Sequence, residues 1–581
     1  MMADRAGRRY VALLLIVFAA AGALRIAWLT ADPPANPAIG IVWHDEGAWA
    51  HNARNRALWG TWRTDEWNPV FVAPVFTALE YGAFRAFGVG TWQARTVPIA
   101  SGLLAVVMAA VGLAALAGRR AALIGGTLLA TNYVFVMWNR AALMESTMTA
   151  FIVAGWAAYV LAERRPRVGL LAGIAVVLAF FTKAAAAFFV AALLLDAMIT
   201  LVGWRSARLR GFTGMPRPTP TLVRAAMWTL GGVALASALI LAAFVLPYWS
   251  EYQFYNWQMS VTRKPEYTLR SLLDRASWLP IVHDYFTRMW LVTSVAALAL
   301  VAIVLRWRTA RPSERLLVLW VLLGLTELVV HDAGNERRYV MFIPALVALA
   351  ALVLGARGTA GPRPEHFGRA SRWLALPFVL VLGYLIVGSL LRLALLGDVG
   401  RSVRWSAAVA AAAGALIAWR WRSVSGWWSR QQMTAAAALG LTAIAVLGDA
   451  VQYAHWARTR TSYNHDASVA LRRLLDDGTL VHGKLANGLS LENRIRPVFV
   501  GRGFGNYEDR TRRNDVRYVL TYIAPWVGYE GRVITDVLDA HPHHRIVTTF
   551  PVAETLAGDD RAALIDKFGS HDPGAGPGAL R

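Results

Sequence analysis

The sequence predicts a polytopic α-helical membrane protein with about 13 transmembrane helices, amphipathic helices beside the membrane, and a C-terminal extracytoplasmic α/β domain. Of its 581 residues, 56% are hydrophobic and only 16% are charged. Soluble proteins carry closer to a quarter of charged residues. Apolar runs of about 20 residues, long enough to cross a bilayer, recur along the chain. Lys and Arg gather in loops on one side, which supports the helix count.

The charge balance and the cysteine count exclude several classes of function. The net charge of +23 follows from Lys and Arg in cytoplasmic loops, so it does not indicate nucleic acid as a partner. The chain has no cysteine, which excludes disulfides, thiol catalysis and Cys-ligated metals. No phosphate-loop signature is present, so the sequence does not indicate ATP as an energy source.

The N-terminus resembles a signal peptide. Arg5, Arg8 and Arg9 precede an apolar run from Val11 to Leu29. Because this run is long enough to span and no clear small-residue cleavage site follows, we interpret it as an uncleaved signal anchor. The N-terminus is then cytoplasmic, and residues 31–95 form a first external loop.

Within this loop, two adjacent carboxylates stand between tryptophans in the stretch Trp43-His44-Asp45-Glu46-Gly47-Ala48-Trp49. Trp favours the boundary between lipid and water, so Asp45 and Glu46 are expected at the membrane surface. Asp45 can begin a helix that ends at Gly60. A second amphipathic helix is expected over 74–87, with Glu80 away from its apolar face. Both helices are expected to lie flat on the membrane.

The remaining crossings follow from apolar runs and basic loop ends. We place them at about 96–117, 121–138, 142–162, 168–203 (two helices broken near Thr182-Lys183) and 227–247, then up to Arg306, up to His331, from Tyr339 to about 357, two helices around the turn 397–402, and 433–453. An odd number of crossings puts the C-terminal part outside a plasma (inner) membrane.

The chain changes character after the last crossing. Residues 1–455 form the transmembrane domain, whereas 456–570 alternate short strands with helices. We place the strands at Leu480-Val481, Val498-Phe499-Val500, Tyr518-Val519-Leu520 and Ile546-Val547. This alternation predicts a small α/β domain with a mainly parallel sheet. Residues 571–581, rich in Gly and Pro, are expected to be a disordered tail.

Polar groups at membrane depth are costly, and are therefore candidates for function. The candidates lie at or near the external end of their helices or in the external loops. As catalytic residues we single out Asp45, Glu46 and Glu145. As substrate-binding residues we single out Arg95, Arg140, Lys183, Tyr255, Lys264, His331, Asp332, Arg337, Arg338 and Tyr339.

Each candidate has a functional and a structural interpretation. Asp45 could be a general base that takes a proton from an attacking hydroxyl or amine, or simply a helix-start residue. Glu145 could be a second acid, or the partner of Arg140 in a salt bridge. Lys183 could pair with a phosphate, or snorkel to the interface.

The second external loop, from 248 to about 280, is dense in Tyr and Trp. With Tyr255 and Lys264 it could form a mobile lid, or an ordinary interfacial aromatic belt. His541, His543 and His544 lie close in sequence, but a zinc site needs further ligands that the sequence does not place. A surface cluster is the favoured interpretation of the three histidines.

A set of motifs together resembles a known family. They are His44-Asp45-Glu46 after the first helix, Pro74, Phe87-Gly88-Val89-Gly90-Thr91-Trp92-Gln93-Ala94-Arg95, Arg140 with Met144-Glu145, Thr182-Lys183, and Arg338-Tyr339 with Pro344. This pattern, over about residues 1–350, resembles the GT-C glycosyltransferases of the protein O-mannosyltransferase and aminoarabinose transferase type (glycosyltransferase family 39-like). The Asp-Glu pair is its most specific motif.

The resemblance implies transfer of a sugar from a polyprenyl-phosphate carrier to a protein, glycan or lipid acceptor in the cell envelope. Asp45 would be the base, and Glu145 would stand where the family often has an Asp. Lys183 and Arg338 would hold the lipid phosphate, transfer would invert the anomeric carbon, and a divalent cation is possible. Two rivals remain: a secondary transporter or flippase, which would place charges near mid-membrane, and a non-catalytic scaffold.

Overall fold

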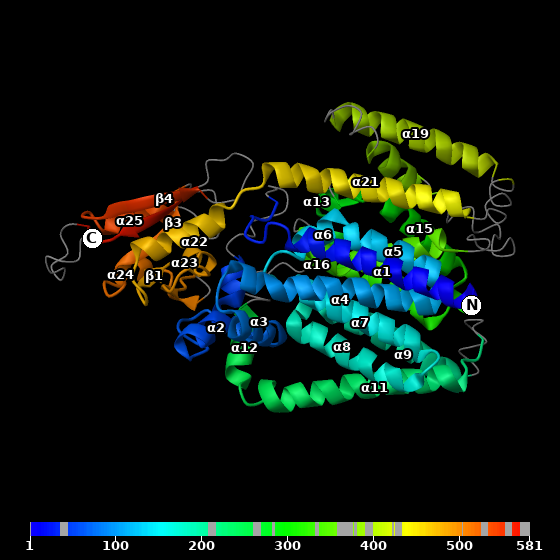
Figure 1. The fold of residues 1–581 in the computed structure, drawn as a ribbon, viewed down its shortest axis with the longest axis horizontal. Helices are drawn as coiled ribbons and strands as arrows, with labels where there is room; N and C mark the ends of the chain where they lie inside the picture. The colour runs from blue at the N-terminus through cyan, green and yellow to red at the C-terminus, as the bar shows by residue number, and fades with distance from the viewer. Residues whose placement is uncertain are drawn as a thin grey trace.

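The computed structural model describes residues 2–34, 45–206, 216–258, 269–281, 285–331, 336–356, 376, 380–389, 399–420, 423, 433–501, 504–523, 533–551 and 561–569. Figure 1 shows an elongated molecule with a helical bundle at one end and a small sheet with its helices at the other. The N-terminal helix begins at the end of the bundle far from the sheet.

The bundle is built from long apolar helices. They are α1 (Met2–Ile26), α4 (Thr91–Ala117), α5 (Arg119–Thr131), α6 (Tyr133–Trp138), α7 (Met144–Ala162), α8 (Gly169–Thr182), α9 (Ala187–Arg205), α11 (Pro220–Ile240), α15 (Trp290–Leu305), α16 (Pro312–His331), α17 (Ile343–Leu354), α19 (Val399–Trp419) and α21 (Ala435–Thr459). Six segments in the described ranges are long and apolar enough to cross a membrane, and five shorter apolar helices accompany them. The chain is therefore a multi-pass membrane protein, whereas the predicted number of 13 crossings stays a prediction.

Shorter elements connect these helices. They are α2 (Asp45–Trp59), η1 (Pro69–Phe71), α3 (Pro74–Phe87), η2 (Pro166–Val168), η3 (Ala184–Ala186), η4 (Leu241–Val245), α12 (Trp249–Trp257), η6 (Leu269–Leu272), α13 (Arg275–Pro280), α14 (Phe286–Arg288), η8 (Trp307–Thr309) and η9 (Glu336–Met341). The predicted bounds of α3 and the break between α8 and α9 are confirmed. The predicted turn at 397–402 lies partly outside the described residues; its described part, 399–402, belongs to helix α19 and is not a turn.

Two predicted helices differ from the structure at their boundaries. The helix expected over 121–138 is interrupted at Asn132, whose side chain accepts a hydrogen bond from the Phe135 N–H and so begins a new helix, α6. The helix expected from Tyr339 begins instead at Ile343, after the 3₁₀ turn η9. Pro344 occupies the first turn of α17, where a missing N–H costs nothing.

Close helix contacts in the bundle depend on small residues. A Cβ added at Gly173 of α8 would lie 2.2 Å from the Thr229 carbonyl oxygen of α11, and one at Gly232 would lie 2.2 Å from the Leu170 carbonyl oxygen. Glycine at both positions lets α8 and α11 approach closely, as is common for helices in membranes.

The first external loop departs from its prediction. α2 does begin at Asp45 and ends before Gly60, which has a φ of 75°. However, every residue from Glu46 to Asn55 is buried, so α2 does not lie flat on a membrane surface. It packs instead against α3 and against α23 (Lys484–Gly488) of the sheet domain. The polar side chains of His51, Asn52, Arg54 and Asn55 therefore find hydrogen-bond partners inside the protein.

The apolar face of α3 is also rotated from the expected one. The helical spacing predicts an apolar face made of Phe76, Leu79, Ala83 and Phe87. Phe76 and Ala83 are buried, but Leu79 and Phe87 are 41% and 56% exposed. Glu80, expected on the polar face, is completely buried. The face of α3 that packs against α2 and α4 therefore includes a carboxylate.

Residues 463–569 form a five-stranded sheet with its helices. The strands are β1 (Leu480–His482), β2 (Arg496–Val498), β3 (Tyr518–Tyr522), β4 (Arg545–Pro551) and β5 (Arg561–Asp566), and the helices are α22 (Tyr463–Leu474), α23, α24 (Asp509–Arg512) and α25 (Val533–Ala540). The strand order is β2-β1-β3-β5-β4.

The sheet is mixed rather than mainly parallel. β1 pairs in parallel with β2 and β3, whereas β5 pairs antiparallel with β3 and β4. The sequence analysis missed β5, which inserts between β3 and β4. The predicted tail 571–581 lies outside the described residues.

Candidate active site

Four charged side chains from four separate segments meet at the end of the bundle that faces the sheet. Arg337 NH1 donates to Asp45 Oδ2, and its Nε lies 3.3 Å from Glu145 Oε1. Lys183 Nζ lies 2.5 Å from the same Glu145 oxygen. The result is a chain of alternating charge, Asp45–Arg337–Glu145–Lys183, which we call the Asp45 cluster.

Local structure explains how each group reaches the cluster. Asp45 and Glu145 stand in the first turns of α2 and α7, where the helix dipole favours a negative charge. Lys183 follows α8 in an extended conformation, with φ −159° and ψ 126°, and so separates α8 from η3. Arg337 lies in η9, the next described element after α16.

The Asp45 cluster is partly open to solvent. The side chains of Asp45 and Arg337 are each 14% exposed, and that of Lys183 is 13% exposed. Glu145 is buried beneath them, and its Oε2 has no hydrogen-bond partner in the described part of the chain. A polar ligand could therefore reach Asp45, Arg337 and Lys183. Glu145 lies between the two cations and pairs with both.

The two residues after Arg337 are placed differently. Arg338 is 7% exposed and close enough to Lys183 to affect it electrostatically. Tyr339 is buried, with its ring centroid 4.3 Å from those of Tyr285 and Phe342. Arg338 therefore adds positive charge beside the cluster, and Tyr339 packs in an aromatic group behind it.

Glu46 forms a separate structural pair. Its two oxygens accept bidentate hydrogen bonds from Arg95 at 2.8 and 2.7 Å, and Oε1 also accepts from the Ala142 N–H at 2.7 Å. Arg95 additionally donates to the carbonyl oxygens of Leu29 and Ala31. Because both side chains are saturated and buried, they fix the start of α2, and this geometry does not present Glu46 to a ligand.

Arg140 likewise holds the chain together. It donates to the carbonyl oxygens of Leu24 and Trp28 at 2.9 and 2.7 Å, and its guanidinium lies 4.5 Å from the Trp456 ring. The structure shows no Arg140–Glu145 salt bridge, because Lys183 and Arg337 are the ion-pair partners of Glu145.

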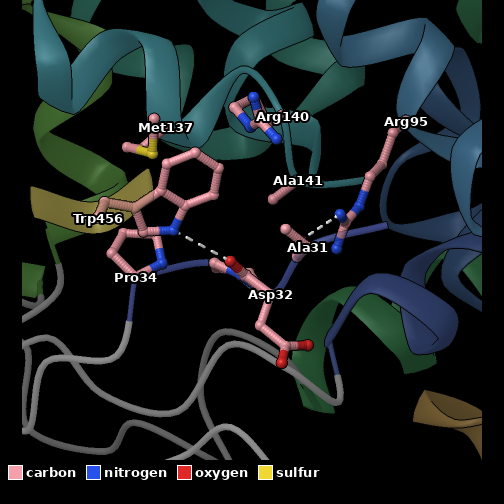
Figure 2. A pocket seen from close by; sticks show the side chains of 9 residues that line it. Ala31, Asp32, Pro34, Arg95, Met137, Arg140, Ala141 and Trp456 are labelled. Carbon is pink, nitrogen blue, oxygen red and sulfur yellow. Dashed lines mark hydrogen bonds between the residues drawn. The ribbon is translucent and has the colours of Figure 1, made fainter. Parts of the chain in front are cut away.

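Arg95 and Arg140 also line a small pocket with Asp32 and Trp456. Figure 2 shows the Trp456 indole N–H directed at the Asp32 carbonyl oxygen and Arg95 at that of Ala31. The pocket holds about 10 Å³, which is space for about one water molecule. It is too small for a sugar.

The other binding candidates lie apart from the cluster or outside the described residues. The Tyr255 hydroxyl accepts from Asn68 Nδ2 at 2.8 Å, and its ring stacks on Phe71. His331 pairs with Glu327 one turn earlier, at 3.0 Å. The residues that fall outside the described ranges are Trp43, His44, Lys264 and Asp332.

The sequence analysis missed a polar network that joins α2 to the sheet domain. His51 Nε2 lies 2.8 Å from Asp65 Oδ1, and its Nδ1 lies 3.1 Å from Asn487 Nδ2. Arg54, one turn further along α2, donates to the carbonyl oxygens of Ser490, Asn493 and Ile495. The available signal was that α2 is polar on all sides, which does not fit a helix lying on lipid.

The part of the chain that the structure describes contains no group of three His, Asp or Glu side chains that could hold a metal ion. His541 and His544 are linked through a hydrogen bond from His544 Nδ1 to the His541 carbonyl oxygen. The possible divalent cation therefore stays a prediction.

Comparison with known proteins identifies the fold. The family model "Dolichyl-phosphate-mannose-protein mannosyltransferase" matches residues 71–213. A crystal structure of ArnT from Cupriavidus metallidurans bound to undecaprenyl phosphate matches at 17% identity and a TM-score of 0.50, over 98% of both chains. Its apo form matches at 16% identity and a TM-score of 0.50, over 99% of this chain and 100% of that one.

A third match is the apo oligosaccharyltransferase of Archaeoglobus fulgidus, at 12% identity and a TM-score of 0.45, over 88% of this chain and 69% of that one. A search of curated protein sequences found no match. The family model and the ArnT structures confirm the resemblance predicted from the sequence, and the chain has the GT-C fold.

Proposed function

We propose that the protein is an integral membrane glycosyltransferase that moves a sugar from a polyprenyl-phosphate carrier to an acceptor at the external membrane face. The single observation that carries the proposal is the Asp45 cluster, in which the partly exposed Asp45 pairs with Arg337, and Arg337 and Lys183 share the buried Glu145. The family-model match and the likeness to ArnT bound to undecaprenyl phosphate support the donor class.

In the proposed reaction, Asp45 accepts the proton of an acceptor hydroxyl or amine as that atom attacks the anomeric carbon. The bond between the anomeric carbon and the phosphate oxygen breaks, and polyprenyl phosphate leaves with the electron pair. A single displacement inverts the anomeric carbon. Lys183, Arg337 and Arg338 stabilise the charge that builds on the leaving phosphate.

The ion pairs of the cluster suggest how the donor activates the site. In the structure, Arg337 is bound to Asp45 and Lys183 to Glu145. A phosphate group would compete with these carboxylates for the two cations. Binding the donor would therefore release Asp45 for proton transfer while Glu145 keeps the cations in place.

The proposed orientation follows from the distribution of arginines. The loop ends at the opposite end of the bundle are basic: Arg119, Arg120, Arg164, Arg165, Arg167, Arg205, Arg306, Arg308 and Arg311. Basic loops remain in the cytoplasm. The N-terminus would then be cytoplasmic, and the Asp45 cluster and the sheet domain would lie outside a plasma membrane.

The proposal is tested by incubating purified protein with labelled polyprenyl-phosphate sugars and measuring free polyprenyl phosphate. Asp45→Asn keeps the shape of the side chain but removes the base. We expect a loss of roughly 10²- to 10⁴-fold in turnover, with carrier binding and thermal stability largely retained.

The matched control is Asp477→Asn, because the Asp477 side chain is 61% exposed in the sheet domain, where it pairs with the exposed Arg494. We expect it to keep wild-type turnover. Near-normal turnover of Asp45→Asn would show that Asp45 is not the general base. Transport of an intact lipid-linked sugar without release of polyprenyl phosphate would favour the flippase instead.

A further inference from the structure

A second cavity lies at the end of the bundle opposite the Asp45 cluster. It has a volume of about 530 Å³ and is bounded by the end of α9, the start of α11 and the segment 307–312. Glu163, directly after α7, also lines it. Because the 19 residues of α7 span about 28 Å, this cavity is a full membrane-crossing helix away from the proposed active site.

The lining of this cavity combines an apolar wall with an excess of positive charge. Ile199, Leu222 and three prolines supply apolar surface. The charged residues on the lining are Arg217, Arg308, Arg311, Arg315 and Glu163. A volume of this size lies within the range of small-molecule sites in proteins.

Three of the five charged groups are engaged within the protein. Arg315 Nε donates to Asp196 Oδ1 at 2.7 Å, and Glu163 Oε1 accepts from the Ser313 N–H at 3.0 Å. Arg311 donates to the Leu116 carbonyl oxygen at 3.2 Å. The single carboxylate of the lining therefore caps the start of helix α16, and four arginines against one glutamate leave the lining with an excess of positive charge.

The other two arginines are positioned for an external anion. Arg217 and Arg308 are exposed, and within the described ranges neither has a carboxylate within ion-pair distance. The Arg217 guanidinium lies 4.2 Å from the Trp204 ring, which holds the side chain at the rim. An anion bound between them would satisfy charge that the protein leaves unbalanced.

We propose that this cavity binds an anionic phospholipid of the leaflet at that end of the bundle. The phosphate would pair with Arg217 and Arg308, which suits arginine geometry, and an acyl chain would follow Ile199 and Leu222. A free phosphate ion would account for the arginines but not for the apolar wall. Basic pockets between membrane helices are known lipid sites.

The test is native mass spectrometry of protein released from micelles that contain equal amounts of phosphatidylglycerol and phosphatidylcholine. Wild-type protein is expected to retain phosphatidylglycerol preferentially. The double variant Arg217→Gln/Arg308→Gln is expected to lose this preference by roughly 30-fold. The matched control Arg165→Gln/Arg167→Gln removes two exposed arginines from the same end of the bundle that do not line the cavity, and it should retain the lipid.

A second variant tests the apolar wall. Gly203 lines the cavity, and a Cβ added there would make only ordinary contacts with Pro218. Gly203→Leu should therefore fill the cavity and reduce lipid retention without removing a charge. Equal retention by wild type and Arg217→Gln/Arg308→Gln, or no preference for the anionic lipid, would overturn the proposal. Displacement of the lipid by millimolar inorganic phosphate alone would also overturn it, because the apolar wall would then contribute nothing.

Discussion

A charge cluster lies near each end of α7, and the two clusters are built differently. Near its C-terminal end, Asp196 accepts from Arg315 through one oxygen at 2.7 Å and from the Tyr159 hydroxyl through the other at 2.8 Å. Near its N-terminal end, Glu145 shares one oxygen between Lys183 and Arg337 and leaves the other without a partner among the described residues. In the first cluster both carboxylate oxygens are hydrogen-bonded, so we call it closed. In the second, one carboxylate oxygen is left to accept a hydrogen bond from a ligand.

This difference separates stability from function. Buried charges that are fully paired contribute little to the net stability of the fold, but removing one partner of such a pair is costly. A partly exposed cluster with unused hydrogen-bonding capacity contributes less to the free energy of unfolding. Its side chains can exchange their partners for groups of the substrate. We therefore expect substitutions among Asp196, Arg315 and Tyr159 to change the free energy of unfolding. Substitutions in the Asp45 cluster should change turnover.

The largest expected effect is on stability in Asp196→Asn. This change leaves Arg315 buried, at 6% exposure, without its counter-ion. Breaking a buried pair in this way costs about 3–5 kcal/mol, measured by denaturant unfolding in micelles. Turnover per folded molecule should stay at the wild-type level, the reverse of Asp45→Asn. Unchanged stability would show that the Asp196–Arg315 pair does not stabilise the fold.

The next largest effect is on turnover in Lys183→Met. Removing one donor from a site that stabilises a developing anion costs about 10²- to 10³-fold. Stability should change less than in Asp196→Asn, because Arg337 still compensates Glu145. The assay is release of polyprenyl phosphate, with Arg494→Gln on the exposed face of the sheet domain as the control. Normal turnover in Lys183→Met would exclude Lys183 from phosphate binding.

A smaller effect is expected where α2 meets the sheet domain. A Cβ at Gly47 would lie 2.2 Å from the Asn487 carbonyl oxygen and 2.7 Å from that of Gly488. Gly47→Ala must therefore push α23 away, at a cost of about 1–3 kcal/mol, with some loss of turnover because Asp45 lies two residues earlier. Gly440→Ala is the control, since its Cβ meets nothing within 4 Å. Equal thermal midpoints for both variants would contradict the tight contact.

The smallest effect is a pH trend from Glu80. Burial, together with the nearby Glu46 carboxylate, holds the pKa of Glu80 well above its usual range. Between the unfolded pKa near 4.3 and this raised value, the folded state binds more protons, so the free energy of unfolding falls as pH rises. Glu80→Gln should remove this decrease, so the stability of the variant relative to wild type should rise as the pH increases above the unfolded pKa. Parallel stability curves would contradict a protonated Glu80.

The sequence predicted site residues best where a charged side chain stands beside an apolar run. Asp45, Glu145 and Lys183 were singled out because charges are rare beside apolar runs, and the structure brings them together with Arg337. Their catalytic and binding roles stay predictions. The bounds of α3 could be predicted because Pro74 and Gly88 mark its ends.

Tertiary contacts could not be predicted in the same way. Glu46 and Asp45 are adjacent in sequence, yet only the fold determines that Arg95 saturates Glu46 while Asp45 remains accessible. α2 was expected on the membrane surface because its sequence does not reveal that α23, more than 400 residues later, covers it. The antiparallel strand β5 was missed because residues 561–566 lack the periodicity that marks a strand against its flanks.

The hydrogen bonds from Arg54 to Ser490, Asn493 and Ile495 span 436 to 441 positions of the chain. Such non-local contacts form late, because the intervening chain must be synthesised and ordered first. The helix that carries Asp45 would thus remain incompletely anchored during biogenesis until the last domain has emerged and docked. A chain truncated before residue 484 would therefore insert in the bilayer without the contacts that hold α2 in place.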